Sequence, residues 1–152
     1  MKLKVKTNIS NYSVIIGKNL SSRINKIILD ERIYSQKFLL VYDSKVPTRM
    51  IKSIVSRFNK KISEKKKIVF NEKSKNLKTV SSIVKILEKN NFSRNDSLIS
   101  VGGGICGDVC GFASSIFKRG LNFINLPTTL LSRVVSAIGG KTGINSLSGK
   151  NM

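Results

Sequence analysis

The sequence contains no histidine and no tryptophan, and only two of its 152 residues are cysteines. Cys106 and Cys110 are four residues apart on one expected helix, so they do not form a disulfide framework. A structural zinc site needs about four Cys, His or carboxylate ligands, so we expect no metal site built by this chain alone. We interpret the two thiols as small buried side chains beside glycines.

Acidic residues are also scarce, because 8 Asp and Glu stand against 28 Lys and Arg, for a formal net charge of +20. A basic chain can bind nucleic acid, carry a solvated Lys-rich surface or attract small anions. The lysines are scattered, as in NKKISEKKK (59–67), and no nucleic-acid-binding module or aromatic stacking platform is recognisable. We therefore expect no nucleic-acid partner.

Long apolar runs are missing too. No stretch approaches the roughly 20 residues of a membrane span, and the start, MKLKVKTNIS, lacks the apolar core of a secretory signal. We expect a soluble, cytoplasmic protein without a membrane partner. The length suits one domain, and 40% hydrophobic residues suffice for a core.

Short β-rich runs alternate with helical periods along the chain. The expected strands are 3–7, 12–16, 38–42, 68–70, 98–101 and 123–126. The expected helices are 20–29, 46–58, 76–90, the segment from the triple glycine to Gly120, and 130–137 with Thr128 as its cap. This alternation predicts an α/β domain with a mostly parallel sheet flanked by helices.

The strongest local signal is SVGGGICGDVCGF (100–112), where a buried strand runs into three glycines and then a helix. Glycines let the backbone approach a phosphate, and a helix start offers free N–H groups and partial positive charge. The segment fits a pyrophosphate cradle, although a tight strand-to-helix turn would need glycine as well. Its spacing is not the G-x-G-x-x-G dinucleotide fingerprint.

Four further polar residues stand at positions that suit ligand binding. Asp43 ends an expected strand, where a carboxylate can bond ribose hydroxyls or simply form a turn. Arg119, Lys141 and Lys150 lie beside glycines, which suits recognition of carboxylate or phosphate, although so many basic residues also place some there by chance.

An ordered set of motifs in 94–152 is more specific than any of these features alone: GGG-x-x-GD, GF-A, RG, PTTLL, S-x-x-GGKT and GKNM. With these motifs the chain resembles 3-dehydroquinate synthase, and earlier YSVIIG (12–17), Asp43 and Glu72-x-x-Lys75 match as well. The resemblance covers less than half of the family's usual length. It implies a Rossmann-like, NAD-binding N-terminal domain over 1–152, without the helical metal-binding domain.

The resemblance implies conversion of 3-deoxy-D-arabino-heptulosonate 7-phosphate to 3-dehydroquinate with release of phosphate, a lyase reaction of the shikimate pathway. Bound NAD is reduced and reoxidised in each cycle, and a zinc or other divalent ion polarises the reacting hydroxyl. The full-length family is commonly dimeric. Alternatives are a related sugar-phosphate cyclase, a folded but inactive remnant, and a basic nucleic-acid-binding module.

The resemblance also assigns roles to individual residues. Its NAD contacts fall on Asp43, Glu72, Lys75, Gly103, Gly104, Asp108, Thr128, Thr129, Lys141 and Lys150. Its substrate contacts fall on Arg119, Lys141, Lys150 and Asn151, of which the last three are the expected catalytic residues. Carboxylates suit the ribose hydroxyls, and cations suit an anionic sugar-phosphate substrate.

Two departures from the family pattern bear on activity. The family carries V-D-S-S before GGKT, whereas this chain has Val135 at the aspartate position, and valine neither accepts a hydrogen bond nor carries charge. The family's metal ligands, one Glu and two His, lie beyond GKNM and are not in this sequence. We therefore expect the chain alone to be inactive, as a fragment of a longer gene product.

Overall fold

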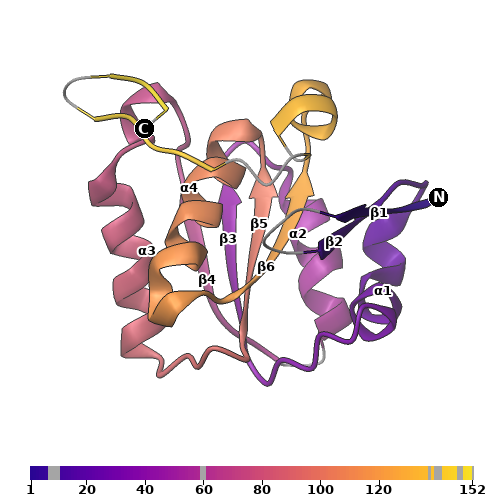
Figure 1. The fold of residues 1–152 in the computed structure, drawn as a ribbon. Helices are drawn as coiled ribbons and strands as arrows, with labels where there is room; N and C mark the ends of the chain where they lie inside the picture. Colours follow the sequence, from indigo (N-terminus) through magenta and orange to yellow (C-terminus); the bar gives the residue numbers. More distant parts are fainter. Residues whose placement is uncertain (7–10, 59–60, 137, 139–141, 147–148, 152) are drawn as a thin grey trace.

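The computed structural model of the chain describes residues 1–6, 11–58, 61–136, 138, 142–146 and 149–151. At its centre is a four-stranded sheet with the order β4-β3-β5-β6, in which all neighbours are parallel (Figure 1). Its strands are β3 (Phe38–Asp43), β4 (Ile62–Ile68), β5 (Ser97–Gly102) and β6 (Asn122–Pro127). The predicted α/β class with a mostly parallel sheet is confirmed.

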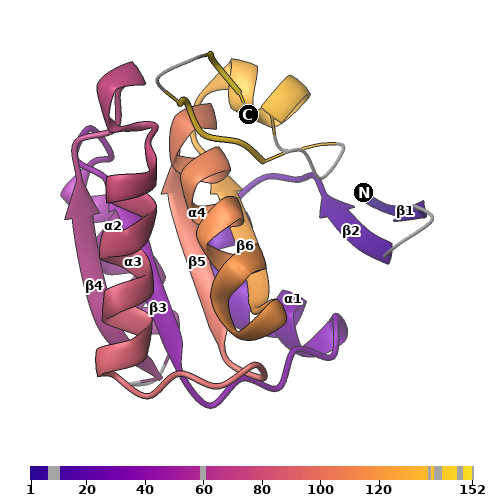
Figure 2. The ribbon, with the colours of Figure 1, turned by 60° about the vertical axis from the view of Figure 1, so that its left-hand side comes forward.

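Helices cover both faces of this sheet. Figure 2 shows α3 (Leu77–Lys89) and α4 (Gly104–Ile116) side by side on one face, with α1 (Ile24–Asp30) and α2 (Thr48–Val55) on the other. Two antiparallel strands, β1 (Lys2–Lys6) and β2 (Asn11–Ile15), form a separate small sheet beyond the β6 side. The hairpin is joined to the end of α1 because Ser13 Oγ donates to Glu31 Oε2 at 2.7 Å.

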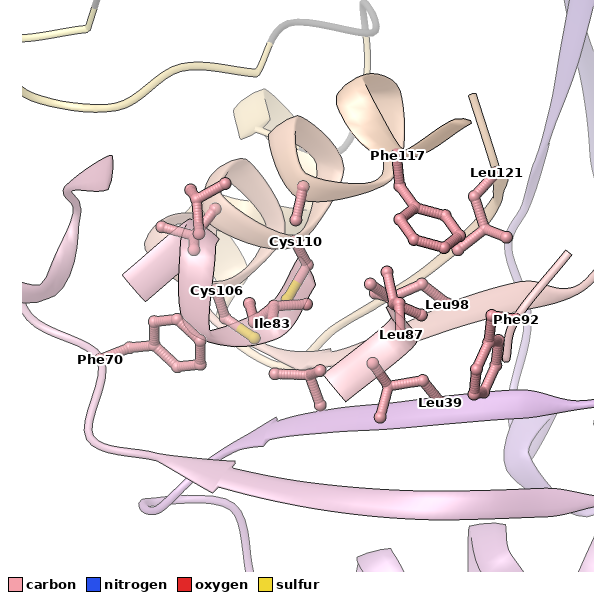
Figure 3. Close-up of a cluster of buried hydrophobic side chains, with 14 residues drawn as sticks. Leu39, Phe70, Ile83, Leu87, Phe92, Leu98, Cys106, Cys110, Phe117 and Leu121 are labelled. Carbon is pink, nitrogen blue, oxygen red and sulfur yellow. The ribbon is translucent and has the colours of Figure 1, made fainter. Parts of the chain in front are cut away.

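The central strands read as continuous apolar runs because both of their faces are buried. In β3, Leu39 and Val41 face the core beneath α3 and α4, while Phe38 and Leu40 face the core beneath α1 and α2. Figure 3 shows the first core, where side chains from the sheet, α3 and α4 interlock. Its fully buried members include Leu39, Ile83, Leu87, Phe92, Leu98, Cys106 and Cys110.

The two cysteines lie in that core, as the sequence predicted. Both are free and buried within α4. Burial raises the pKa of the Cys110 thiol well above its ordinary value, and the neighbouring Cys106 side chain adds to the effect. They are therefore packing groups, because only the thiolate is a good nucleophile or metal ligand.

Two local predictions were wrong. A strand was expected at 68–70, whereas β4 covers Ile62–Ile68 and takes in most of the Lys-rich run. β4 is an edge strand, paired with β3, and none of its residues is fully buried, so lysines are tolerated there. The consecutive lysines 65–67 conceal the strand in the sequence. Thr129, and not Thr128, caps the last helical segment, since its Oγ1 accepts from Ser132 N at 3.2 Å.

Helix boundaries also differ from the sequence-based expectation. The predicted helix 20–29 is a 3₁₀ turn (Leu20–Arg23) followed by α1, and 46–58 is α2 followed by a 3₁₀ turn (Ser56–Phe58). The segment predicted at 130–137 includes a short π-helix, Ser132–Ser136. Among the described residues, no helix has both the length and the apolar character needed to cross a membrane.

Candidate functional site

The carboxyl ends of the four parallel strands meet at one edge of the sheet, where a cleft of ≈ 750 Å³ opens. That volume lies in the usual range for small-molecule sites, and this edge is where open α/β sheets bind ligands. Eight of the predicted cofactor residues line the cleft: Asp43, Glu72, Lys75, Gly103, Gly104, Asp108, Thr128 and Thr129. Asn151, predicted from the substrate set, lines it as well.

The glycine turn forms one wall of the cleft. β5 ends at Gly102, Gly103 is the N-cap of α4 with φ −79° and ψ −170°, and no side chain caps this helix start. The first N–H groups of α4 are therefore open to a ligand, together with the positive end of the helix dipole. A Cβ added at Gly103 would meet only the Thr129 side chain, at 3.5 Å, so bare backbone lines the cleft here.

Of the two interpretations of Asp43, the turn is observed, and the ribose contact stays a prediction. Its carboxylate accepts from the backbone N–H of Lys45 at 3.0 Å and so forms a turn after β3. It is only 8% exposed, yet it also lines the cleft. The turn therefore fixes the orientation of a carboxylate at the sheet edge.

Lys75 is the most deeply buried charge of the site, with 6% exposure. Its Nζ lies 2.6 Å from Asp108 Oδ2 on α4 and donates to Asn151 Oδ1 at 2.5 Å. We call Lys75, Asp108 and Asn151 the Lys75 cluster. A buried ammonium requires such partners, because desolvation of an unpaired charge is costly.

Residues 142–146 and 149–151, the C-terminal segment, fold back over the 3₁₀ turn Glu72–Ser74 at the top of α3 (Figure 1). Asn145 N donates to the Lys75 carbonyl at 2.7 Å, and Asn145 Nδ2 donates to Glu72 Oε2 at 2.9 Å. Asn145 Oδ1 accepts from Asn151 N at 3.2 Å. Sequence reasoning missed Asn145, because a lone asparagine between two motifs carries no local signal.

Arg119 and Lys150 are not among the residues that line the cleft. Arg119 lies beyond α4 in a separate hollow of ≈ 510 Å³ with Arg94 and Asn122, near the amino end of β6. Lys150 is exposed and adjoins Asn151 in the chain. Lys141 and the side chain of Val135 lie outside the described part of the structure. The roles of all four stay predictions.

Among the residues with described positions, the donor set does not fit a metal ion. Within the described residues, no three His, Cys, Asp or Glu side chains are grouped so as to hold one. The sequence as a whole contains no histidine.

Comparison with known proteins shows which family shares this sequence. The sequence pattern of the family described as 3-dehydroquinate synthase N-terminal matches residues 65–152. The chain belongs to the 3-dehydroquinate synthase family. It is 50% identical over 152 residues to the 3-dehydroquinate synthase of Pelagibacter ubique and 41% identical over 153 residues to that of Methylacidiphilum infernorum. All of this chain is covered, but only 41% and 42% of those relatives.

Solved structures of sugar-phosphate cyclases share the fold of this 3-dehydroquinate synthase family member. A 2-deoxy-scyllo-inosose synthase complexed with carbaglucose-6-phosphate, NAD+ and Co2+ has a TM-score of 0.89 at 24% identity, and covers 100% of this chain and 41% of its own. A 2-epi-5-epi-valiolone synthase from Streptomyces hygroscopicus with NAD+ and Zn2+ has a TM-score of 0.79 at 23% identity, over 99% of this chain and 41% of its own.

Proposed function

We propose that the chain is the NAD-binding portion of a 3-dehydroquinate synthase, the enzyme that converts 3-deoxy-D-arabino-heptulosonate 7-phosphate to 3-dehydroquinate and phosphate. The observation that carries the proposal is the gathering of eight predicted NAD contacts, from four separate segments of chain, in one cleft at the carboxyl edge of the sheet. Family membership and the 50% identity to a named synthase support the reaction class.

The chemistry of the cleft fits NAD part by part. Carboxylates of Asp43 and Glu72 accept hydrogen bonds from ribose hydroxyls and would repel the extra phosphate of NADP. Bare backbone at Gly103 and Gly104 and the open start of α4 suit the pyrophosphate. When bound, NAD supplies reversible acceptance of hydride, while the protein holds cofactor and substrate in register.

The proposal places metal-dependent chemistry outside this chain, because the sequence has no histidine and the described residues hold no group of three metal-ligating side chains. The purified 152-residue polypeptide is therefore expected to release no phosphate from the substrate above a blank without protein. The related sugar-phosphate cyclases remain the alternative within the same fold. The Gly107-Asp108 pair, the stretch from GGKT to GKNM and the 50% and 41% identity to 3-dehydroquinate synthases favour dehydroquinate synthase.

Calorimetric titration of the purified chain tests the cofactor assignment. NAD+ should bind with one site per chain, and NADP+ should bind at least about tenfold more weakly because its added phosphate meets carboxylates. Titration with duplex DNA at two salt concentrations tests the basic-module alternative. Steeply salt-dependent DNA binding without any NAD+ binding would refute the proposal and select that alternative.

A further inference from the structure

Glu72 is the least constrained of the carboxylates that line the cleft. Asp43 is held by its own turn, and Asp108 by the buried ammonium of Lys75. Glu72 stands on an exposed 3₁₀ turn, and its Oε2 receives a side-chain hydrogen bond from Asn145 at 2.9 Å. A long, exposed glutamate samples several rotamers, so a fixed partner decides whether its carboxylate points to the ligand.

Asn145 uses both ends of its side chain in this region. Its Nδ2 donates to the Glu72 carboxylate, and more weakly to the Glu72 carbonyl at 3.4 Å. Its Oδ1 accepts from the backbone N–H of Asn151, whose side chain receives the Lys75 ammonium. Its own backbone N–H is bonded to the Lys75 carbonyl at 2.7 Å. One amide therefore connects an exposed carboxylate to the Lys75 cluster.

We infer that Asn145 is a positioning residue of the cofactor site, which orients the Glu72 carboxylate toward the cleft. The inference rests on the proposed function, because Glu72 has a ligand to meet only if NAD binds in the cleft. Asn145 itself is not among the residues that line the cleft, so it acts through Glu72 and not by contact.

The chemistry demands an amide at this position. Only a side chain with both a donor and an acceptor serves a carboxylate on one side and a backbone N–H on the other. Alanine removes both bonds. Aspartate keeps the size and the acceptor but replaces the donor to Glu72 with a like charge, so Asn145→Asp should turn the Glu72 carboxylate away with little disturbance of packing.

The experiment is calorimetric titration of the purified chain with NAD+, for the unaltered protein and for the variants Asn145→Ala, Asn145→Asp, Glu72→Ala and the double variant Asn145→Ala/Glu72→Ala. Loss of a hydrogen bond to a charged acceptor should weaken NAD+ binding about tenfold in Asn145→Ala. In the Glu72→Ala background the same substitution should cost less than about twofold, because the carboxylate that it orients is already gone.

A matched control is Asn90→Ala at the far end of α3, where the side-chain amide donates to the Ile86 carbonyl at 2.9 Å. This variant also loses an asparagine hydrogen bond, but NAD+ affinity should stay unchanged. Thermal melting of each variant identifies any that fail to fold, and Asn145→Asp then gives the decisive titration if Asn145→Ala does not fold.

The possible results distinguish the positioning role of Asn145 from NAD binding by the chain. If the unaltered chain binds NAD+ but Asn145 variants bind equally well, or if the penalty persists undiminished without Glu72, Asn145 has no positioning role while the proposed function stands. If the unaltered chain does not bind NAD+, the proposed function and the inference resting on it both fail.

Discussion

The glycine turn gives a sharp prediction because neighbouring glycines, Gly102 and Gly103, serve different purposes. A Cβ built on Gly102 would lie 2.7 Å from Cys106 Cβ, 2.9 Å from Cys106 Sγ and 3.2 Å from Asp43 Cβ. Cβ atoms cannot rotate away, so Gly102→Ala forces β5 and α4 apart. A Cβ on Gly103 would touch only the Thr129 side chain, at 3.5 Å, which is ordinary contact.

Two opposing contributions set the change in stability expected for Gly102→Ala. Overpacking of a buried core costs about 1–3 kcal/mol, and loss of glycine freedom in the unfolded chain returns about 0.4–1 kcal/mol. Gly102→Ala should therefore lower the free energy of unfolding by about 1–2 kcal/mol, or the melting temperature by roughly 2–8 °C for a chain of this size. Gly103→Ala should leave both nearly unchanged, because φ there is negative.

Urea unfolding followed by circular dichroism measures the stability of both variants, and calorimetric titration measures their NAD+ affinity. We expect Gly103→Ala to fold normally and to bind NAD+ at least about tenfold more weakly, since its methyl group occupies the approach of the pyrophosphate. A stable Gly102→Ala variant would refute the steric reasoning. Full NAD+ affinity in Gly103→Ala would show that the dinucleotide does not lie against this turn.

Three other predictions concern residues away from the cleft. Burial raises the pKa of Asp96, but hydrogen bonds from Ser93 and the Lys37 N–H outweigh burial and hold it below its usual 3.8. The ionised carboxylate therefore stabilises the fold above pH 3.8, and this stabilisation is lost as the pH falls through the lowered pKa. Asp96→Asn should lower the free energy of unfolding by about 1–2 kcal/mol at pH 7. In urea titrations at several pH values, the variant should also lose less stability on acidification than the unaltered protein. Arg119→Ala should leave NAD+ affinity unchanged in calorimetry, because Arg119 lies in the other hollow; a large loss would mean that it reaches the cleft. Phe92→Ala should cost about 3–5 kcal/mol in the same unfolding assay, since Phe92 is fully buried, and a loss below about 1 kcal/mol would contradict this packing.

The sequence predicted the buried centre of the sheet and its β6 edge well, and its β4 edge poorly. β3 and β5 are recognisable because strands buried on both faces become unbroken apolar runs such as Phe38–Tyr42. β4 was not recognisable, because an edge strand needs little apolar surface and its lysines resemble a loop. The true limits of β4 are set by pairing with β3, which is tertiary information.

The same distinction applies to the candidate site. Glycines, carboxylates and threonines at strand ends could be assigned from their motifs, and the structure brings Asp43, Gly103 and Thr128 into one cleft. Asn145 could not be assigned, because its partner Glu72 lies 73 positions earlier and no local pattern records that contact. The placement of Arg119 could not be foreseen either, since its Arg-Gly motif does not tell which end of α4 faces the ligand.

The return of the C-terminal segment over residues 73 and 76 positions earlier has a consequence for biosynthesis. During translation the sheet can pair before residue 145 leaves the ribosome, but the bonds from Asn145 and Asn151 close only afterwards. Ordering this terminal segment costs conformational entropy that only a few hydrogen bonds offset, so it is the first part expected to open. A nascent chain would thus acquire its core well before it acquires a finished nucleotide cleft.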